Sequence, residues 1–361
     1  YEHFMFKEIM EQPKAIRDTV FPRIQNNRVV LDDLSISAEY LNDMDKIYII
    51  ACGSSYHVGV IAKYILEYTL RKPVEVALAS EFRYCNPIVT EHTLCIVISQ
   101  SGETIDTLAA MREAKRLGAR VLSIVNVVGS TIARESDDVL YTWAGPEIAV
   151  ATTKAYSTQL AVIYLICLKF AEMMGRMSEE EYARIVTELL KIPSKIETIL
   201  EHKETVQYLA SVYFNHSSIF FIGRNIDYAI GLEGSLKLKE ISYIHSEAYA
   251  AGELKHGTIS LIEDGTLVVA LASHAGLFDK LMSNVKEVKA RGADVLGLTT
   301  ENLVEEMSKT VNHAISVPET HPMLVPSLDV VPMQLFAYYV ALMRGCDIDK
   351  PRNLAKSVTV E

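Results

Sequence analysis

Hydroxyl-rich turns follow two apolar runs of the chain and could bind a phosphate. One of them, Ser99-Gln100-Ser101-Gly102-Glu103-Thr104, stands between a β-branched run and a helical pattern. Three hydroxyls, an amide and the N–H groups of a helix start suit an oxyanion, because the helix dipole adds partial positive charge. A simple helix N-cap uses the same residue types, so that alternative stays open. The nucleotide motifs G-x-x-x-x-G-K-[ST] and G-x-G-x-x-G are missing from the sequence.

The other turn is Cys52-Gly53-Ser54-Ser55-Tyr56-His57, at the end of an earlier apolar run. Gly53 permits a tight turn, and Ser54 and Ser55 would then face the crevice at the strand end. A capped helix start is the alternative here as well.

Three further groups could transfer protons or trap a carbonyl. Glu233, Lys237 and Glu240 follow the spacing i, i+4, i+7 and share one helical stripe, which could move protons or form a solvent-exposed salt-bridge ladder. His256 precedes Gly257 and is either an acid/base group near neutral pH or a structural histidine. Lys356, in the tail, could trap a carbonyl or be solvated. No Cys/His grouping has ligand spacing, so we expect no metal.

These residues lie in a chain that repeats itself. Gly53 after the first strand-like run matches Gly223, and Gln159-Leu160 matches Gln334-Leu335, so the spacing drifts only from 170 to 175 residues. Conserved order and spacing indicate a duplicated domain. The matching position in the second half reads Gly223-Arg224-Asn225, without a hydroxyl pair. The halves therefore share a fold and differ in chemistry.

Each half alternates strand-like and helix-like segments. Unbroken runs such as Val121-Leu122-Ser123-Ile124-Val125 are typical of parallel strands buried on both faces, and residues 105–117 predict a helix that ends at Gly118. This order predicts an α/β fold with, in each half, a doubly wound, mostly parallel sheet flanked by helices. Ligands of such sheets bind beyond the carboxyl ends of the strands, where both hydroxyl turns fall.

Length and composition exclude several classes of protein. The chain has 361 residues, which favours about two domains. Its net charge of −11 argues against nucleic acid or an anionic membrane as partner. Five cysteines without a C-x-x-C pair predict reduced thiols of a cytoplasmic protein. The longest strongly apolar stretch, residues 160–168, is too short to span a bilayer.

The order of four motifs resembles the isomerase part of the glutamine–fructose-6-phosphate aminotransferase family, also called glucosamine-6-phosphate synthases. The motifs are Cys52-Gly53-Ser54-Ser55-Tyr56, the turn 99–104, Glu253-Leu254-Lys255-His256-Gly257 and the tail 351–361. The resemblance covers essentially the whole chain, and the tail is its most specific part. It implies two tandem sugar-isomerase (SIS) domains, in agreement with the duplication.

The resemblance also implies a reaction and the residues that perform it. Fructose 6-phosphate and ammonia would give glucosamine 6-phosphate without a cofactor. Lys356 would form a Schiff base, Glu240 would carry the proton between C1 and C2, and Lys237 would assist near the sugar hydroxyls. His256 would promote ring opening from the neighbouring subunit of a homodimer. The residues implied to contact the sugar phosphate are Ser54, Ser55, Ser99, Gln100, Ser101, Thr104 and Thr152.

The resemblance further predicts how the chain is organised. The expected parts are an N-terminal helical linker segment (1–37), SIS domain 1 (38–180), connecting helices (181–210), SIS domain 2 (211–345) and a tail carrying the lysine (346–361). The family's glutaminase domain, which begins with a cysteine, is expected upstream in the full-length protein, so this chain would use free ammonia. Two alternatives stay open: a stand-alone SIS isomerase or amino-sugar deaminase, and a non-catalytic module that senses a sugar phosphate.

Overall fold

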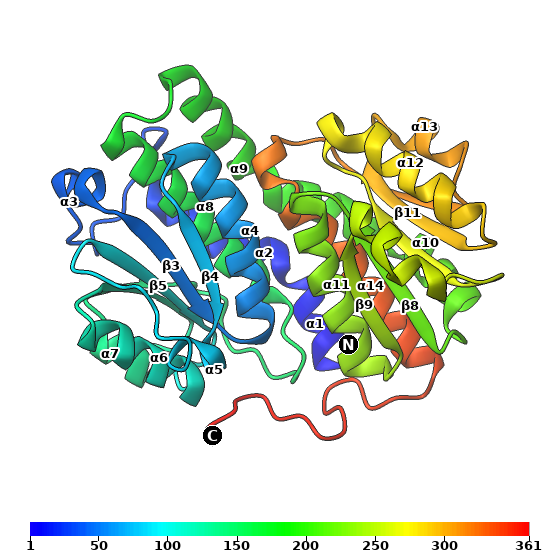
Figure 1. Cartoon of the computed structure of the whole chain (residues 1–361), viewed down its shortest axis with the longest axis horizontal. Helices are drawn as coiled ribbons and strands as arrows, with labels where there is room; N and C mark the ends of the chain where they lie inside the picture. The colour runs from blue at the N-terminus through cyan, green and yellow to red at the C-terminus, as the bar shows by residue number, and fades with distance from the viewer. Residues whose placement is uncertain (361) are drawn as a thin grey trace. The chain divides into compact units, whose positions relative to one another are not determined.

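The computed structural model describes residues 1–360, which form two compact units interleaved along the chain (Figure 1). The first unit consists of Glu11–Glu147, Lys154–Lys191 and the tail from Ala355 onward. The second unit consists of Tyr1–Met10, Ile148–Thr153 and Ile192–Leu354. Each unit is built around its own sheet.

The sheet of the first unit has five strands in the order β4-β3-β5-β6-β7, and every neighbouring pair is parallel. The strands are β3 (Lys46–Ala51), β4 (Val74–Leu78), β5 (Thr93–Ser99), β6 (Arg120–Val125) and β7 (Asp138–Tyr141). β5 is buried along its whole length, as its unbroken apolar sequence predicts for a central parallel strand. A two-stranded antiparallel ribbon, β1 (Ile24–Gln25) with β2 (Arg28–Val29), precedes the sheet.

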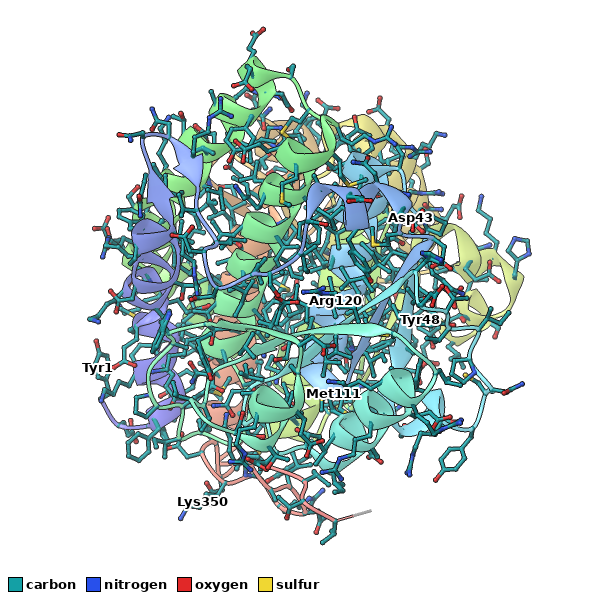
Figure 2. The ribbon with its side chains drawn as sticks, turned by 90° about the vertical axis from the view of Figure 1, so that its left-hand side faces the viewer. Tyr1, Asp43, Tyr48, Met111, Arg120 and Lys350 are labelled. Atoms are coloured by element: carbon teal, nitrogen blue, oxygen red, sulfur yellow. The ribbon has the colours of Figure 1, made fainter. Side chains whose placement is uncertain are left out.

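Helices cover both faces of this sheet. One face packs on α5 (Ala79–Phe82), α6 (Ile105–Arg116) and α7 (Thr131–Glu135) through a buried cluster that includes Tyr48 and Met111, both labelled in Figure 2. α4 (Gly53–Leu70) lies on the other face, where Gly59 approaches Ile49 and Val76 too closely for a larger residue. The remaining helices of the unit are α2 (Gln12–Val20), η1 (Phe21–Arg23), α3 (Ala38–Asp43) and α8 (Lys154–Met174).

The sheet of the second unit has the order β12-β11-β10-β8-β9, again with every pair parallel. Its strands are β8 (Ser218–Gly223), β9 (His245–Ala250), β10 (Leu267–Leu271), β11 (Asp294–Thr300) and β12 (His313–Val317). Read from the opposite edge, this strand order corresponds to that of the first sheet. In both five-stranded sheets the strand that comes first in the sequence lies second from one edge. The two doubly wound sheets therefore confirm the predicted fold class and the duplication.

The second sheet is also covered on both faces. α12 (Phe278–Lys289) and α13 (Val304–Ser308) pack on one face, and α11 (Ile226–Ser242) with α14 (Pro326–Met343) on the other, where Gly234 contacts Phe221 and Met333. The other helices are α1 (Phe4–Met10), α10 (Lys203–Tyr213), η2 (Ala251–His256), η3 (Thr258–Leu261), η4 (Ala275–Leu277) and η5 (Pro322–Leu324). α9 (Glu179–Glu201) runs across the boundary between the two units in sequence.

Two helical segments are long and apolar enough to cross a membrane, Lys154–Met174 and Pro322–Met343. In the folded chain 83% and 94% of the 18-residue apolar window of each segment are buried, because each one packs in the interior of its unit. Their apolar composition is therefore accounted for by the protein core.

Candidate functional site

The turn after β5 gathers the hydroxyls that the sequence predicts. Ser99 Oγ lies 3.1 Å from Thr104 Oγ1 and accepts the Gly102 N–H at 3.0 Å. Ser101 Oγ accepts the Glu103 N–H at 3.1 Å. Gly102 has φ +66°, a conformation that glycine adopts at little cost. The turn is thus a preorganised cluster of hydroxyls at the start of α6.

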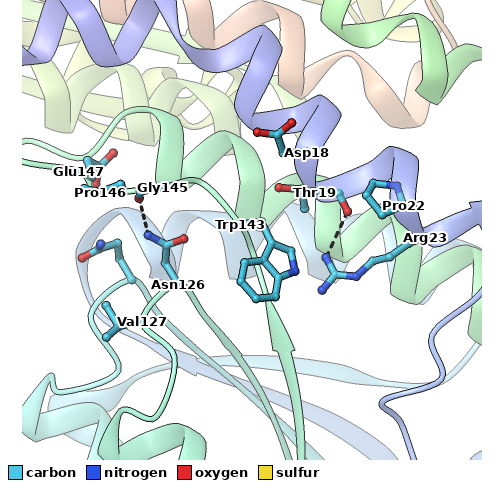
Figure 3. Close-up of a pocket in the computed structure, with 11 residues that line it drawn as sticks. Asp18, Thr19, Pro22, Arg23, Asn126, Val127, Trp143, Gly145, Pro146 and Glu147 are labelled. Atoms are coloured by element: carbon cyan, nitrogen blue, oxygen red, sulfur yellow. Dashed lines mark hydrogen bonds between the residues drawn. The ribbon is translucent and has the colours of Figure 1, made fainter.

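A carboxylate fastens this turn to the next helix. Glu103 Oε1 accepts the Thr131 N–H at 2.7 Å, at the start of α7, and this hydrogen bond lowers the pKa of Glu103. Gln100, the amide of the turn, lies beside a cavity of about 970 Å³ that also involves Trp143, Arg23 and Glu147 (Figure 3). In that view the Trp143 ring lies between Arg23 and Asn126. The turn therefore adjoins a space that can accept a small polar ligand.

The second hydroxyl pair follows β3, the parallel neighbour of β5. α4 starts at Gly53, which has φ +55°. Ser54 is buried, and Ser55 Oγ donates to Gln159 Oε1 of α8 at 3.1 Å. Because the carboxyl ends of parallel strands meet at one edge of a sheet, both serines lie on the same edge as the turn after β5.

The tail of the chain lies against the turn after β5. Ser357 Oγ is 3.2 Å from Ser101 Oγ, and the Ile105 N–H donates to the Val358 carbonyl at 3.1 Å. One of the helix N–H groups that the sequence assigned to a phosphate is therefore bonded to the tail. Lys356, the residue before these contacts, places Nζ 2.5 Å from Oε2 of Glu147.

Three predicted residues of the second unit lie on or near α11. Lys237 is fully buried, with Nζ 2.5 Å from Glu240 Oε2 and 3.6 Å from Glu233 Oε1. Glu233 is fully buried too, whereas the Glu240 side chain is 22% exposed. The alternative of a solvent-exposed salt-bridge ladder is wrong for this stripe, because Lys237 and Glu233 are fully buried. Buried charges of this kind require a close partner. Glu240 is the member of the group that solvent can reach.

His256 and Thr152 also belong to the second unit. His256 is exposed at the end of η2, followed by Gly257 with φ +151°. Thr152 lies in the segment Ile148–Thr153, which is held by the Val150 N–H donating to the Asp349 carbonyl at 3.0 Å. The predicted site residues are thus divided: the hydroxyl turns and Lys356 belong to the first unit, and Lys237, Glu240, His256 and Thr152 to the second.

Sequence reasoning missed Glu147, the partner of Lys356. The two residues are 209 positions apart, and no spacing rule connects them. The sequence Gly145-Pro146-Glu147 marks a turn, but it gives no sign that the carboxylate is fully buried.

It also missed a pair of buried carboxyls in the second unit, Asp227 on α11 and Asp329 on α14. Burial raises the pKa of Asp227 to about 7, and burial together with Asp227 raises the pKa of Asp329 well above its usual range. The folded unit binds these protons more tightly than the unfolded chain. The stabilisation from Asp227 is therefore complete below about pH 4 and is lost as the pH rises through 7, by roughly 4 kcal/mol.

Comparisons with known proteins agree with this geometry. Residues 40–169 and 213–344 each match the family model of the SIS domain. The whole chain is 58% identical to part of the glutamine–fructose-6-phosphate aminotransferase [isomerizing] of Clostridium acetobutylicum, and equally to that of Caldanaerobacter subterraneus. The chain spans 59% of the length of each of these relatives.

Solved structures are similar over nearly the full chain. The C-terminal domain of glucosamine-fructose-6-phosphate aminotransferase from Francisella tularensis is 36% identical with a TM-score of 0.92, covering 97% of this chain and 99% of that one. A glucosamine-6-phosphate deaminase from Thermotoga maritima is 25% identical with a TM-score of 0.76, covering 99% of both chains.

Proposed function

Because this chain belongs to the SIS domain family, and within it to the isomerase part of the glutamine–fructose-6-phosphate aminotransferases, we propose that it converts fructose 6-phosphate and ammonia to glucosamine 6-phosphate. One observation carries the proposal: the tail segment that contains Lys356 lies against the hydroxyl turn of the first sheet. Ser357 contacts Ser101 in that turn, and Lys356 is the residue before it.

The phosphate would bind to neutral donors. Ser99, Ser101 and Thr104 offer hydroxyls at the start of α6, where the helix dipole favours an anion. Gln100, Ser54 and Ser55 would add contacts to the sugar phosphate, and Thr152 would line the sugar site. Hydrogen bonds from neutral groups explain how a protein of net charge −11 can take an anionic substrate.

The chemistry would proceed through an imine at C2. The Lys356 amine adds to the carbonyl of the open ketose and water leaves; ammonia then displaces the lysine and gives the fructosimine. Glu240 removes a proton from C1 and returns it to C2, while the imine nitrogen gains one proton and the C1 hydroxyl loses one, so that C1 becomes the aldehyde and C2 carries the amine of glucosamine 6-phosphate. Lys237 would hold Glu240 and approach the sugar hydroxyls, and the proposal requires no cofactor.

His256 would open the sugar ring. Its exposure supports a role at the surface of a neighbouring subunit, and we include in the proposal a homodimer in which His256 is shared. The ammonia would come from glutamine, hydrolysed by a domain upstream in the full-length protein. We further propose that the enzyme is cytoplasmic.

The test is replacement of the tail lysine. Lys356→Met should abolish formation of glucosamine 6-phosphate from fructose 6-phosphate and ammonium, and also the isomerisation to glucose 6-phosphate. Lys350→Met, at an exposed tail lysine six residues earlier, is the control and should keep the parent rate. Activity of Lys356→Met within about twofold of the parent would remove this lysine from the mechanism.

A second candidate is an amino-sugar deaminase, favoured by the similarity to the Thermotoga maritima protein. It predicts release of ammonia from glucosamine 6-phosphate without net synthesis at millimolar ammonium. A sugar-phosphate sensor, the third possibility, predicts binding of fructose 6-phosphate with no turnover of any of these substrates.

A further inference from the structure

The fully buried carboxylate of Glu147 lies against the nitrogen that the proposed function makes reactive. Glu147 Oε2 is 2.5 Å from Lys356 Nζ, a charge-assisted contact within the first unit. The lysine side chain is 24% exposed, so its amine can reach a ligand while it touches the carboxylate.

The protein fixes the position of this carboxylate. The other oxygen, Oε1, accepts the Ala155 N–H in the first turn of α8 at 3.1 Å. The turn before Glu147 is tied to the end of β6, since Asn126 Nδ2 donates to the Gly145 carbonyl at 2.8 Å (Figure 3). A carboxylate held by one oxygen presents the other in a defined direction, as a proton-transfer group requires.

From this geometry we propose that Glu147 takes the proton that Lys356 must lose before it attacks the ketose, and then delivers a proton to the hydroxyl that leaves as water. This inference rests on the proposed function, because it assumes that Lys356 attacks the ketose.

The step balances without a further reactant. The Lys356 ammonium passes one proton to Glu147, and the resulting amine attacks C2, whose oxygen takes a second proton from that nitrogen. Glu147 then protonates the departing hydroxyl, which leaves as water while the nitrogen lone pair forms the protonated imine. The carboxylate is restored, and one ammonium and one carbonyl have become one iminium and one water.

A purely structural ion pair is the competing explanation, and a neighbouring pair supplies the control. Lys154 Nζ lies 2.8 Å from Glu11 Oε2 in the same unit, and Lys154 is nearly buried. Glu11→Gln removes a comparable ion pair that includes neither Glu147 nor the tail lysine. It should lower stability without a change in imine formation.

The experiment traps the imine by borohydride reduction with fructose 6-phosphate and follows the mass of the Lys356 peptide with time. Glu147→Gln preserves the acceptor for Ala155 N–H but removes the proton acceptor, and we expect trapping to slow about 100-fold at pH 7. The deficit in the trapping rate should shrink as the pH is raised to 10, because hydroxide from the solvent then accepts the lysine proton in place of Glu147. A structural defect would persist at every pH.

Glu147→Ala supplies a second readout. The cavity of about 970 Å³ beside Glu147 has room for formate, and formate should restore at least tenfold of the lost trapping rate. Trapping in Glu147→Gln at the parent rate, a pH-independent deficit, or no response to formate would each overturn the role of Glu147. If the parent protein itself traps no sugar on Lys356, the proposed function fails instead.

Discussion

Gly102→Ala tests whether the turn after β5 must keep its observed shape. Gly102 has φ +66°, and a Cβ there would lie 2.0 Å from Ser130 Oγ and 2.5 Å from Ser130 Cβ. The left-handed conformation costs an alanine about 1–2 kcal/mol. Overpacking against Ser130 adds about 1–3 kcal/mol. The turn can relieve this strain by moving away from its observed shape. If a return to that shape on ligand binding costs only about 1.4 kcal/mol, the affinity for the sugar phosphate falls tenfold.

The chain offers a matched control and a rescue for this substitution. Gly129 has φ +73° and nothing within 4 Å of its Cβ position, so Gly129→Ala carries the same backbone strain without the clash. Ser130→Gly removes both clashing atoms and, at the cap position of α7, costs only a few tenths of a kcal/mol. The double variant Gly102→Ala, Ser130→Gly should therefore recover most of the lost affinity.

The assay is calorimetric titration with fructose 6-phosphate, alongside urea unfolding of each variant. We expect at least a tenfold weaker Kd for Gly102→Ala and less than a twofold change for Gly129→Ala. Equal effects of the two substitutions would show that backbone strain alone acts, and an unchanged Kd for Gly102→Ala would remove this turn from the binding site.

Two more perturbations test the second unit. Asp227→Asn keeps the acceptor for the His274 N–H and removes one of the two buried carboxyls, so the decline of its urea stability between pH 4 and 7 should be smaller than in the parent by roughly 4 kcal/mol. Exposed Asp279→Asn should keep the full decline. An unchanged decline in Asp227→Asn contradicts the assigned cause. Mixing inactive His256→Ala and Glu240→Gln chains should restore up to about a quarter of parent activity if His256 is shared across a homodimer, and no recovery in verified mixed dimers places both groups in one subunit.

The sequence predicted the elements that depend on local pattern. Unbroken apolar runs identified the buried parallel strands, and the predicted helix 105–117 differs from α6 (Ile105–Arg116) by one residue at the C-terminal end, where Gly118 has φ +103°. The hydroxyls of Ser99 and Thr104 were expected to converge, and they do, because a strand end and a helix start fix a short turn between them.

What the sequence could not show depends on burial and on distant contacts. The spacing of Glu233, Lys237 and Glu240 places them on one stripe but does not reveal that the stripe faces the interior of the second unit. Similarly, nothing local indicates that the tail lysine Lys356 would lie against Glu147, since such a contact exists only after the chain has folded back on itself.

The two halves of the duplication differ because a side chain already fills one turn. In the first unit the turn after β5 presents the hydroxyls of Ser99 and Thr104. In the second unit the turn after β10 places its His274 N–H against the buried Asp227 carboxyl, at 3.0 Å from Oδ2. A carboxyl that accepts this N–H stands where a phosphate oxygen would accept it, and its partial charge repels an anion. The two sheets of the duplication are therefore similar, while one buried carboxyl distinguishes the turn of the second sheet from that of the first.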